Sequence, residues 1–170
     1  GSQESLYDAA FPAPKTGWAV GANGTILMTV DGGAKWTPRK SGTAANLFDV
    51  MFLDAAHGWI AGADGTILST DDGGKTWQAK SWIEGRPGSI AALKVNKLIQ
   101  DPADPAMLYL ATSGNGLWVS RSRGDLWAKV IDAGGVLDPD ANVLGLAVNP
   151  DNPGEWFVAV FQKKRGGFIA

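Results

Sequence analysis

Short apolar runs alternate along the chain with polar segments rich in glycine. The stretches 47–53, 58–62, 66–70 and 76–80 are typical, since each is mainly apolar or alternating and is bounded by turn residues. We find no window of eleven residues with the apolar stripe of an amphipathic helix. The pattern therefore predicts an all-β chain built from short strands.

The strand pattern repeats. Residues 6–11, LYDAAF, recur as residues 47–52, LFDVMF, and the copies keep this spacing of 41 residues as far as Trp36 and Trp77. A more diverged third copy lies 50 residues further on, with Trp127 in the place of Trp77, and a fourth fills the C-terminal part of the sequence. Four short strands in a period of about 40–50 residues predict the blade of a β-propeller.

The predicted fold is therefore an all-β propeller segment of about three and a half four-stranded antiparallel blades, an incomplete ring. We name the strands of each blade A to D in chain order. The expected boundaries are a tail at 1–5, blade 1 at 6–46, blade 2 at 47–92, blade 3 at 93–140 and a partial blade 4 at 141–170. Gly1-Ser2 resembles the scar of a cleaved tag. We expect such a segment to be arc-shaped alone, and to need the remaining blades or another copy of itself beside its open flanks.

Composition excludes several classes of protein. The net charge of −2 argues against a nucleic-acid binder that works by bulk charge, and no apolar run is long enough to span a membrane. The absence of cysteine leaves no disulfide framework and no thiolate metal site. The unusual features are 23 glycines and eight tryptophans, which favour many tight turns and large repeated packing anchors.

The C–D turn of each blade combines acids or hydroxyls, glycines and a tryptophan, at a spacing that resembles the Asp-box, or bacterial neuraminidase repeat. Blade 2 carries the full motif, blade 1 replaces one hydroxyl residue with lysine, and blade 3 lacks both the aspartate and the second threonine. The motif residues are Thr29, Asp31, Gly33 and Trp36 in blade 1, Thr70, Asp72, Gly74, Thr76 and Trp77 in blade 2, and Ser120, Gly124 and Trp127 in blade 3.

We interpret this motif as a structural turn. Its aspartate would accept hydrogen bonds from following backbone N–H groups, and its glycines would supply positive φ. Its tryptophan would cover the turn and pack between blades, with the indole N–H finding a carbonyl. The alternative is a metal loop, which would need more oxygen ligands than Asp71 and Asp72 provide. We therefore expect no metal site and no cofactor.

Blades 1 and 2 together resemble the propeller family of the photosystem II stability and assembly factor, through the shared pattern Leu-x-Asp-x-x-Phe, Gly-Trp-x-x-Gly and Gly-Thr-Ile-Leu-x-Thr. The Asp-Pro turn at 101–105 is similar to turns in the Asp-box propellers of sortilin-type receptors and xyloglucan-degrading endoglucanases. The resemblance implies the fold but leaves function open, because such propellers include binders, scaffolds and glycosidases. The expected location is extracytoplasmic, meaning secreted, periplasmic or lumenal.

No constellation of catalytic residues is apparent. A sialidase would need an arginine cluster and a nucleophilic tyrosine, but the only tyrosines, Tyr7 and Tyr109, lie in apolar strand-like runs. An inverting endoglucanase needs two separated carboxylates across a cleft, and nothing in the sequence pairs such acids. The single histidine, His57, falls in a predicted A–B turn and is interpreted as a surface residue. We assign no catalytic residue.

Differences between the blades point to a candidate binding surface. The B–C loop of blade 4 is longer than the others and strongly basic, and the D–A connection after Trp77 is expanded. A solvated loop is the simpler interpretation, and a positive surface for an acidic protein or a glycan is the functional one. The candidate residues are Lys163, Lys164, Arg165, Trp82 and Arg86.

The favoured function is a non-enzymatic propeller scaffold or binding module that assists the assembly or stability of a protein complex through its loop face. The alternatives are a fragment of a xyloglucanase-like or sialidase-like hydrolase and a carbohydrate-binding propeller. We expect a protein or glycan partner, no nucleic acid and no membrane span.

Overall fold

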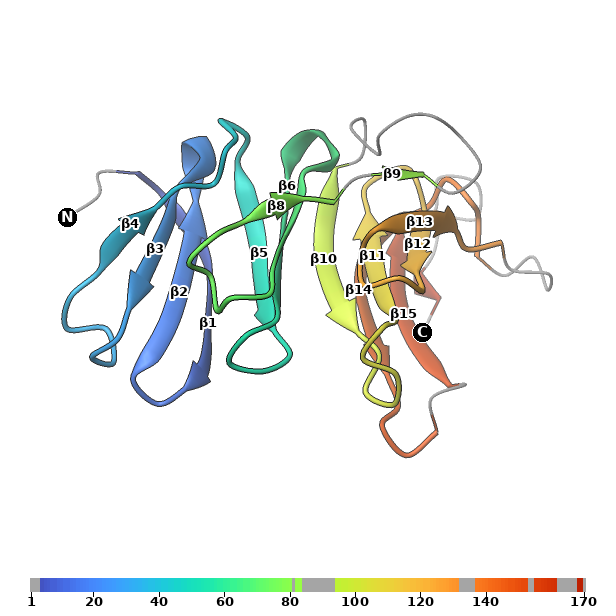
Figure 1. Cartoon of the computed structure of the whole chain (residues 1–170). Helices are drawn as coiled ribbons and strands as arrows, with labels where there is room; N and C mark the ends of the chain where they lie inside the picture. The colour runs from blue at the N-terminus through green and yellow to red at the C-terminus, as the bar shows by residue number, and fades with distance from the viewer. Residues whose placement is uncertain are drawn as a thin grey trace. The chain divides into compact units, whose positions relative to one another are not determined.

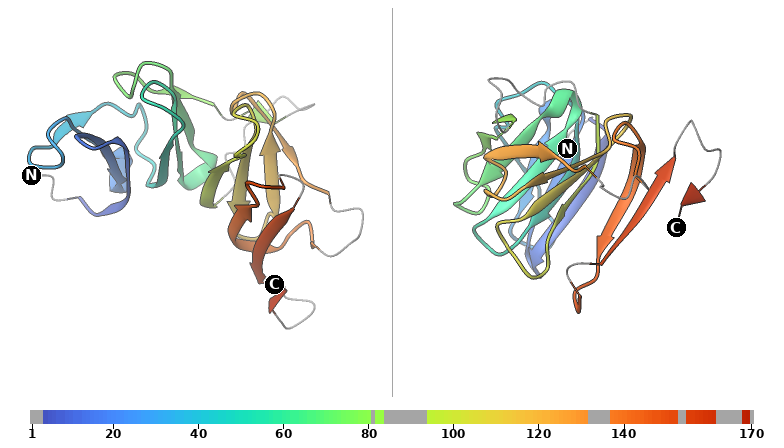
Figure 2. Two further views of the ribbon diagram at one scale, coloured as in Figure 1. Left: turned by 90° about the horizontal axis from the view of Figure 1, so that it is seen from below. Right: turned by 90° about the vertical axis from the view of Figure 1, so that its right-hand side faces the viewer.

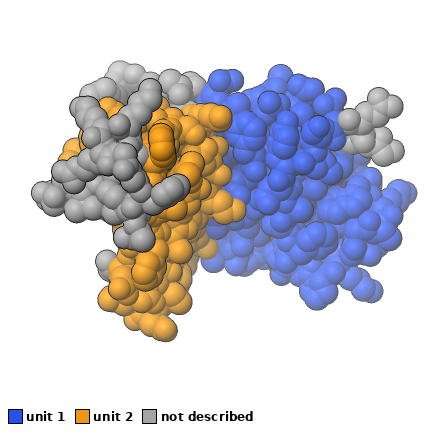
Figure 3. All heavy atoms as spheres, turned by 180° about the vertical axis from the view of Figure 1, so that it is seen from behind, with its two compact units in different colours: residues 1–80 blue, residues 81–170 orange. Residues whose placement is uncertain are grey.

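The structure is a computed structural model that describes residues 4–80, 94–131, 137–152 and 155–161, and the backbone alone at 82–83 and 168–169. Its regular elements are strands and two short 3-10 turns, so the all-β prediction is confirmed (Figure 1). Contacts divide the chain into two compact units, residues 1–80 and 81–170, coloured separately in Figure 3. No helix in the described part of the chain is long and apolar enough to cross a membrane.

The first unit contains two four-stranded antiparallel sheets, in the orders β1-β2-β3-β4 and β5-β6-β7-β8. These are blades 1 and 2, with strands A to D in chain order. Blade 1 comprises β1 (Leu6–Ala13), β2 (Thr16–Gly21), η1 (Ala22–Gly24), β3 (Ile26–Thr29) and β4 (Thr37–Arg39), and blade 2 comprises β5 (Leu47–Phe52), β6 (Gly58–Gly62), η2 (Ala63–Gly65), β7 (Ile67–Thr70) and β8 (Gln78–Ala79).

The second unit contains blade 3 and part of blade 4. Blade 3 comprises β10 (Val95–Gln100), β11 (Leu108–Thr112), β12 (Leu117–Ser120) and β13 (Leu126–Lys129), and the described strands of blade 4 are β14 (Asn142–Val148), β15 (Trp156–Phe161) and β16 (Phe168–Ile169). Strands β14 and β15 run side by side in both views of Figure 2. The sheets are those of a partial propeller of about three and a half blades.

Blade 3 departs from the expected four strands. A fifth strand, β9 (Trp82–Ile83), pairs in parallel with β13 at the outer edge of this sheet. These two residues fall in the range that the sequence assigned to blade 2. Their pairing satisfies backbone groups of β13 that would otherwise form an exposed sheet edge.

The B–C hairpins of unit 1 follow from an Asn-Gly and an Asp-Gly pair. Asn23 and Gly24 have φ values of 53° and 70°, and the N–H of Thr25 donates to the carbonyl of Ala22 at 3.0 Å. Positive φ at both central residues is the type I′ geometry, whose twist matches that of the paired strands. The same geometry recurs at η2, with Asp64 and Gly65 in the central positions.

A core lies between the two sheets of each unit. In unit 1 Trp18, Val20 and Ile26 of blade 1 pack against Leu47 and Leu68 of blade 2. The corresponding cluster of unit 2 joins blades 3 and 4 through Tyr109, Ala111, Leu117, Val119, Ala141, Val143 and Val160. Because each sheet buries a face against its neighbour, its strands are more continuously apolar than those of a sheet with one wet face.

Candidate functional site

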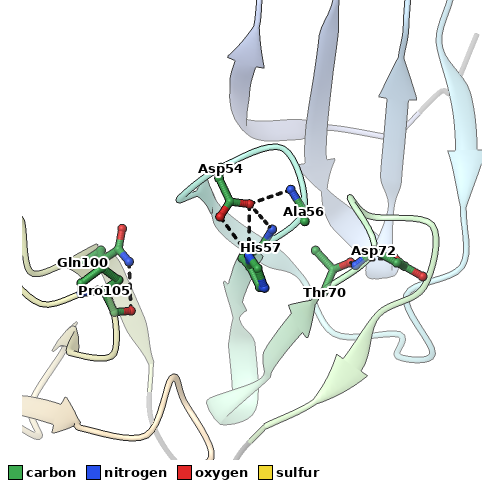
Figure 4. A network of polar contacts seen from close by, with 7 residues as sticks. All are labelled: Asp54, Ala56, His57, Thr70, Asp72, Gln100 and Pro105. Carbon is green, nitrogen blue, oxygen red and sulfur yellow. Dashed lines mark hydrogen bonds and ion pairs between the residues drawn. The ribbon is translucent and has the colours of Figure 1, made fainter.

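The Asp-box turn of blade 2 is a closed hydrogen-bond network, of which Figure 4 shows Thr70 and Asp72. Asp72 Oδ1 accepts the hydroxyl of Thr70 at 2.8 Å and the N–H groups of Lys75 and Thr76, each at 2.9 Å. Asp72 Oδ2 accepts the Thr76 hydroxyl at 2.6 Å. The Thr70 hydroxyl oxygen in turn accepts the N–H of Gly74 at 2.9 Å. The carboxylate therefore holds both sides of the turn.

Blades 1 and 3 build the same turn with fewer polar groups. In blade 1 Asp31 Oδ1 accepts the Thr29 hydroxyl at 2.8 Å and the N–H of Lys35 at 2.9 Å. In blade 3 the Ser120 hydroxyl accepts the N–H of Gly124 at 2.8 Å, and the Ser122 hydroxyl takes the place of the carboxylate by accepting the N–H of Leu126 at 2.9 Å. A hydroxyl is therefore a sufficient acceptor for this turn.

These hydrogen bonds stabilise the charged form of each carboxylate. The hydroxyl and N–H of Thr76 lower the pKa of Asp72 to about 2, and the N–H of Lys35 is the main cause of a lowered pKa at Asp31. The carboxylate oxygens of Asp31 and Asp72 accept hydrogen bonds from within their own turns. Among the described residues, no group of three or more histidine, cysteine, aspartate or glutamate side chains is arranged to hold a metal ion.

The Asp-box tryptophan differs from expectation in its indole group. Trp77 packs against the core of unit 1 and meets the ring of Phe52 edge-on at 5.9 Å. Its buried Nε1, however, has no hydrogen-bond partner among the described residues, and neither have Nε1 of Trp18 and Trp127. The prediction that the indole N–H would find a carbonyl is therefore wrong for Trp77 and Trp127 among the described residues.

The A–B turn of blade 2 holds the only histidine. Asp54 Oδ1 accepts the N–H groups of Ala56 and His57, and its Oδ2 lies 2.9 Å from His57 Nδ1 (Figure 4). The His57 side chain is the main cause that lowers the pKa of Asp54 to about 2. The Ala56 carbonyl accepts the N–H of Gly73 at 2.9 Å, so this turn supports the neighbouring Asp-box turn.

Tyr109 is buried in unit 2 and donates its hydroxyl to Asp101 Oδ2 at 3.0 Å. Asp101 Oδ1 accepts the N–H groups of Ala103 and Asp104, which closes the Asp-Pro turn before β11. Burial and the adjacent Asp101 raise the pKa of Tyr109. A buried phenol held in its protonated form is a poor nucleophile, so this pair is an anchor for the turn.

Strand A of each blade carries one extra residue at the same register position. The pairing shifts between Leu6 and Asp8, and equivalent shifts occur in the other three blades, so each strand A contains a β-bulge. Bulges bend a strand and redirect a side chain. The bulged residues of unit 1 are Tyr7 and Phe48, whose ring centroids lie 5.5 Å apart, and Tyr7 is 47% exposed.

Two asparagines occur at the same strand ends as this aromatic pair, because Asn23 follows Gly21, the partner of Leu6, and Asn46 precedes β5. Asn46, adjacent to Leu47 in the chain, accepts the N–H of Asn23 on its side-chain oxygen at 3.1 Å. The side-chain amide of Asn23 donates to Glu4 at 2.9 Å. We call Tyr7, Phe48, Asn23 and Asn46 the strand A surface. This surface was not predicted from sequence, although the paired motifs LYD and LFD contain both aromatic residues.

The binding residues expected from sequence lie largely outside the described residues. This holds for Lys163, Lys164, Arg165 and Arg86, and for Trp82 the structure describes only the backbone, in β9. The proposed basic surface therefore stays a prediction from sequence.

Comparison with known proteins agrees with this architecture. The family model for the photosynthesis system II assembly factor YCF48 matches residues 1–45 and 40–101. Together these ranges cover more than half of the chain. No curated protein matches the chain significantly.

Solved structures share the fold at low identity. YCF48 bound to a D1 peptide is similar with a TM-score of 0.65 and 21% identity, over 98% of this chain and 53% of that one. YCF48 from Cyanidioschyzon merolae is similar with a TM-score of 0.62 and 21% identity, over 96% of this chain and 59% of that one. The GH74 xyloglucanase from Xanthomonas campestris is similar with a TM-score of 0.69 and 15% identity, over 91% of this chain and 26% of that one. The chain thus spans about half the length of these YCF48 proteins.

Proposed function

Because the chain belongs to the photosynthesis system II assembly factor YCF48 family, we propose that it is a non-enzymatic propeller module that binds a protein segment and assists the assembly or stability of a protein complex. A YCF48 structure that holds a D1 peptide supports a protein partner. The proposed location is extracytoplasmic, in keeping with the family.

The observation that carries this proposal is the strand A surface. Exposed aromatic rings give large contact areas at a small cost in side-chain entropy, and they are enriched where proteins bind one another. Asn23 follows Gly21, the partner of Leu6 in the sheet, and Asn46 precedes β5, so their amides occur at the same strand ends as Tyr7 and Phe48 and would be offered to the backbone of an extended segment. An aromatic pair bordered by amides fits a peptide, and the basic residues 163–165 would add attraction for an acidic partner.

A labelled D1 peptide, of the kind that YCF48 binds, tests the proposal by fluorescence anisotropy. We expect saturable binding, and the double substitution Tyr7→Ser, Phe48→Ser should weaken it at least about tenfold. Val30→Ser is the matched control, because Val30 is 66% exposed and lies between Thr29 and Asp31 in the Asp-box turn of blade 1, not in strand A. Unchanged affinity in a double variant that stays folded by circular dichroism would remove the strand A surface from the proposal.

A glycan-active hydrolase is the second candidate, since GH74 enzymes share this fold. The described aspartates of the turns, such as Asp31, Asp54 and Asp72, are held by backbone N–H groups and hydroxyls, which suits anchoring better than catalysis. Release of reducing sugar from xyloglucan by the purified chain would favour the hydrolase. No release, together with binding of the peptide, would favour the assembly module.

A further inference from the structure

Within unit 1, Trp18 of blade 1 packs into a depression on blade 2, which we call the socket, formed by Phe52, Gly74 and Trp77. Trp18 is 1% exposed and stacks on Phe52, with centroids 4.1 Å apart and an interplanar angle of 27°. A Cβ placed on Gly74 would lie 2.2 Å from Trp18 Nε1, so the indole rests directly on the glycine of the Asp-box turn. Gly58 leaves the space that the Phe52 ring occupies, and Trp77 supports that ring edge-on.

Blade 1 carries the same socket on its other face. Phe11 meets Trp36 edge-on at 6.0 Å, and Gly17 leaves room for the Phe11 ring as Gly58 does for Phe52. Gly33 occupies the position in this turn that Gly74 occupies in blade 2. A Cβ on Gly33, however, would meet only the Trp36 ring of its own turn within 4 Å among the described residues, with no ring from another blade above it.

The residues around this second socket are exposed where their equivalents in blade 2 are covered. Leu6 is 48% exposed and its equivalent Leu47 is fully buried, while Phe11 is 49% exposed. A hollow of about 580 Å³ lies on this face, lined among others by Leu6, Leu27, Trp36 and Pro38. We call the face formed by these residues, Phe11 and Gly33 the socket face.

The pairing register identifies the side chain that would fill such a socket. Trp18 lies opposite Ala10 of strand A, and Tyr109 at the same position of blade 3 packs on Trp156 of blade 4. In both units, therefore, the aromatic residue at this position of strand B contacts the next blade.

Blade 4 presents an aromatic residue at this same position. Phe157, opposite Ala147, is 59% exposed, and Phe161 further along β15 is 48% exposed. We call the face formed by these two residues the knob face. Two large exposed apolar side chains on one strand are typical of an interaction surface.

We propose that a second copy of this chain docks its knob face onto the socket face, with Phe157 taking the position on Phe11 and Gly33 that Trp18 takes on Phe52 and Gly74. The contact is head-to-tail, because it joins two different surfaces. Each copy keeps one face of each kind available, so association continues until the chain of copies closes or is capped. The two faces share no residue with the strand A surface, although Leu6 adjoins Tyr7 in β1, and the second copy is a different partner from the one proposed above.

Sedimentation equilibrium of the full chain, from micromolar to hundreds of micromolar, tests the proposal. We expect wild type to self-associate, and Leu6→Asp and Phe157→Asp should each weaken association at least about tenfold. Val30→Asp and Ile131→Asp are matched controls, because both residues are well exposed outside the two faces, at 66% and 82%, and both variants should behave as wild type.

Mixing the two face variants is the decisive measurement. Each retains one intact face, so an equimolar mixture should form a one-to-one dimer and no larger species. A wild type that stays monomeric at the highest concentration would overturn the proposal, and so would a mixture of folded variants that stays monomeric. Should circular dichroism show Leu6→Asp to be unfolded, Pro38→Glu at the exposed rim of the hollow replaces it in the same test.

Discussion

Gly74 and Gly33 form a matched pair that measures the contact between blades 1 and 2. Both lie in Asp-box turns with positive φ, 74° at Gly74 and 95° at Gly33, and each donates its N–H to the threonine hydroxyl at 2.9 Å. They differ in what lies above them, since Trp18 rests on Gly74 alone. Alanine at each position therefore imposes the same backbone change but only one intrusion into the core.

The backbone cost is common to both substitutions. Alanine in the left-handed region costs roughly 1–2 kcal/mol, and the loss of unfolded-state freedom on replacing glycine offsets about 0.4–1 kcal/mol of this. We therefore expect Gly33→Ala to destabilise by about 1 kcal/mol. At Gly74 the new methyl also displaces the Trp18 ring from Phe52, which adds roughly 1–3 kcal/mol of overpacking. The total expected for Gly74→Ala is about 2–4 kcal/mol.

Equilibrium urea unfolding followed by far-ultraviolet circular dichroism measures the difference, at a concentration low enough to keep the chain monomeric. A double-mutant cycle with Trp18→Ala separates the contributions, because in that background Gly74→Ala should cost no more than Gly33→Ala does. Equal losses for the two glycine variants in the presence of Trp18 would refute the stacking of the indole on the turn. A cost of Gly74→Ala that persists without Trp18 would refute it independently.

Three further predictions concern other positions. In the folded chain the pKa of Asp72 is about 2, against an ordinary pKa of 3.8. The ionised carboxylate therefore contributes its full stabilisation above pH 3.8 and loses it as the pH falls toward 2. The urea midpoint should fall over this range, and it should fall less for Asp72→Asn. Tyr109→Phe should lower the free energy of unfolding by about 1–3 kcal/mol, because the buried Asp101 carboxylate loses a donor, and an unchanged calorimetric melting temperature would contradict this. Serine at residues 163–165 should flatten the salt dependence of partner binding without altering stability, whereas an unaltered slope would favour a solvated loop.

Most of the fold was predictable because it repeats. The spacing between LYDAAF and LFDVMF placed β1 and β5, and the positions of turns and strands in blade 1 then applied to blade 2. Strand β9 was not predictable in the same way. Its two residues form a strand only because β13 offers an edge beside them, and such pairing is set by tertiary contacts and not by local pattern.

The chemistry of the Asp-box turn was accessible from sequence, since carboxylate, hydroxyl and glycine each have one obvious role in a tight turn. The strand A surface was not. Tyr7 and Phe48 occur in apolar runs and look like core residues, and in β5 the bulge before Asp49 separates Phe48 from its buried neighbours Leu47 and Asp49. A bulge depends on the register of two strands, so one strand's sequence does not reveal it.

The three complete turns show which part of the motif the fold requires. A hydroxyl accepts the glycine N–H in every one, from Thr29, Thr70 and Ser120. The second acceptor varies. It is a carboxylate that accepts two hydrogen bonds in blade 1 and four in blade 2, and a serine hydroxyl in blade 3. The turn therefore depends on a short acceptor at the first position and on the glycine conformation, and the aspartate adds stability to a shape that is already specified. A charge that can be replaced by a hydroxyl in the same chain serves structure, which leaves the strand A surface, the socket face and the knob face as the proposed binding surfaces.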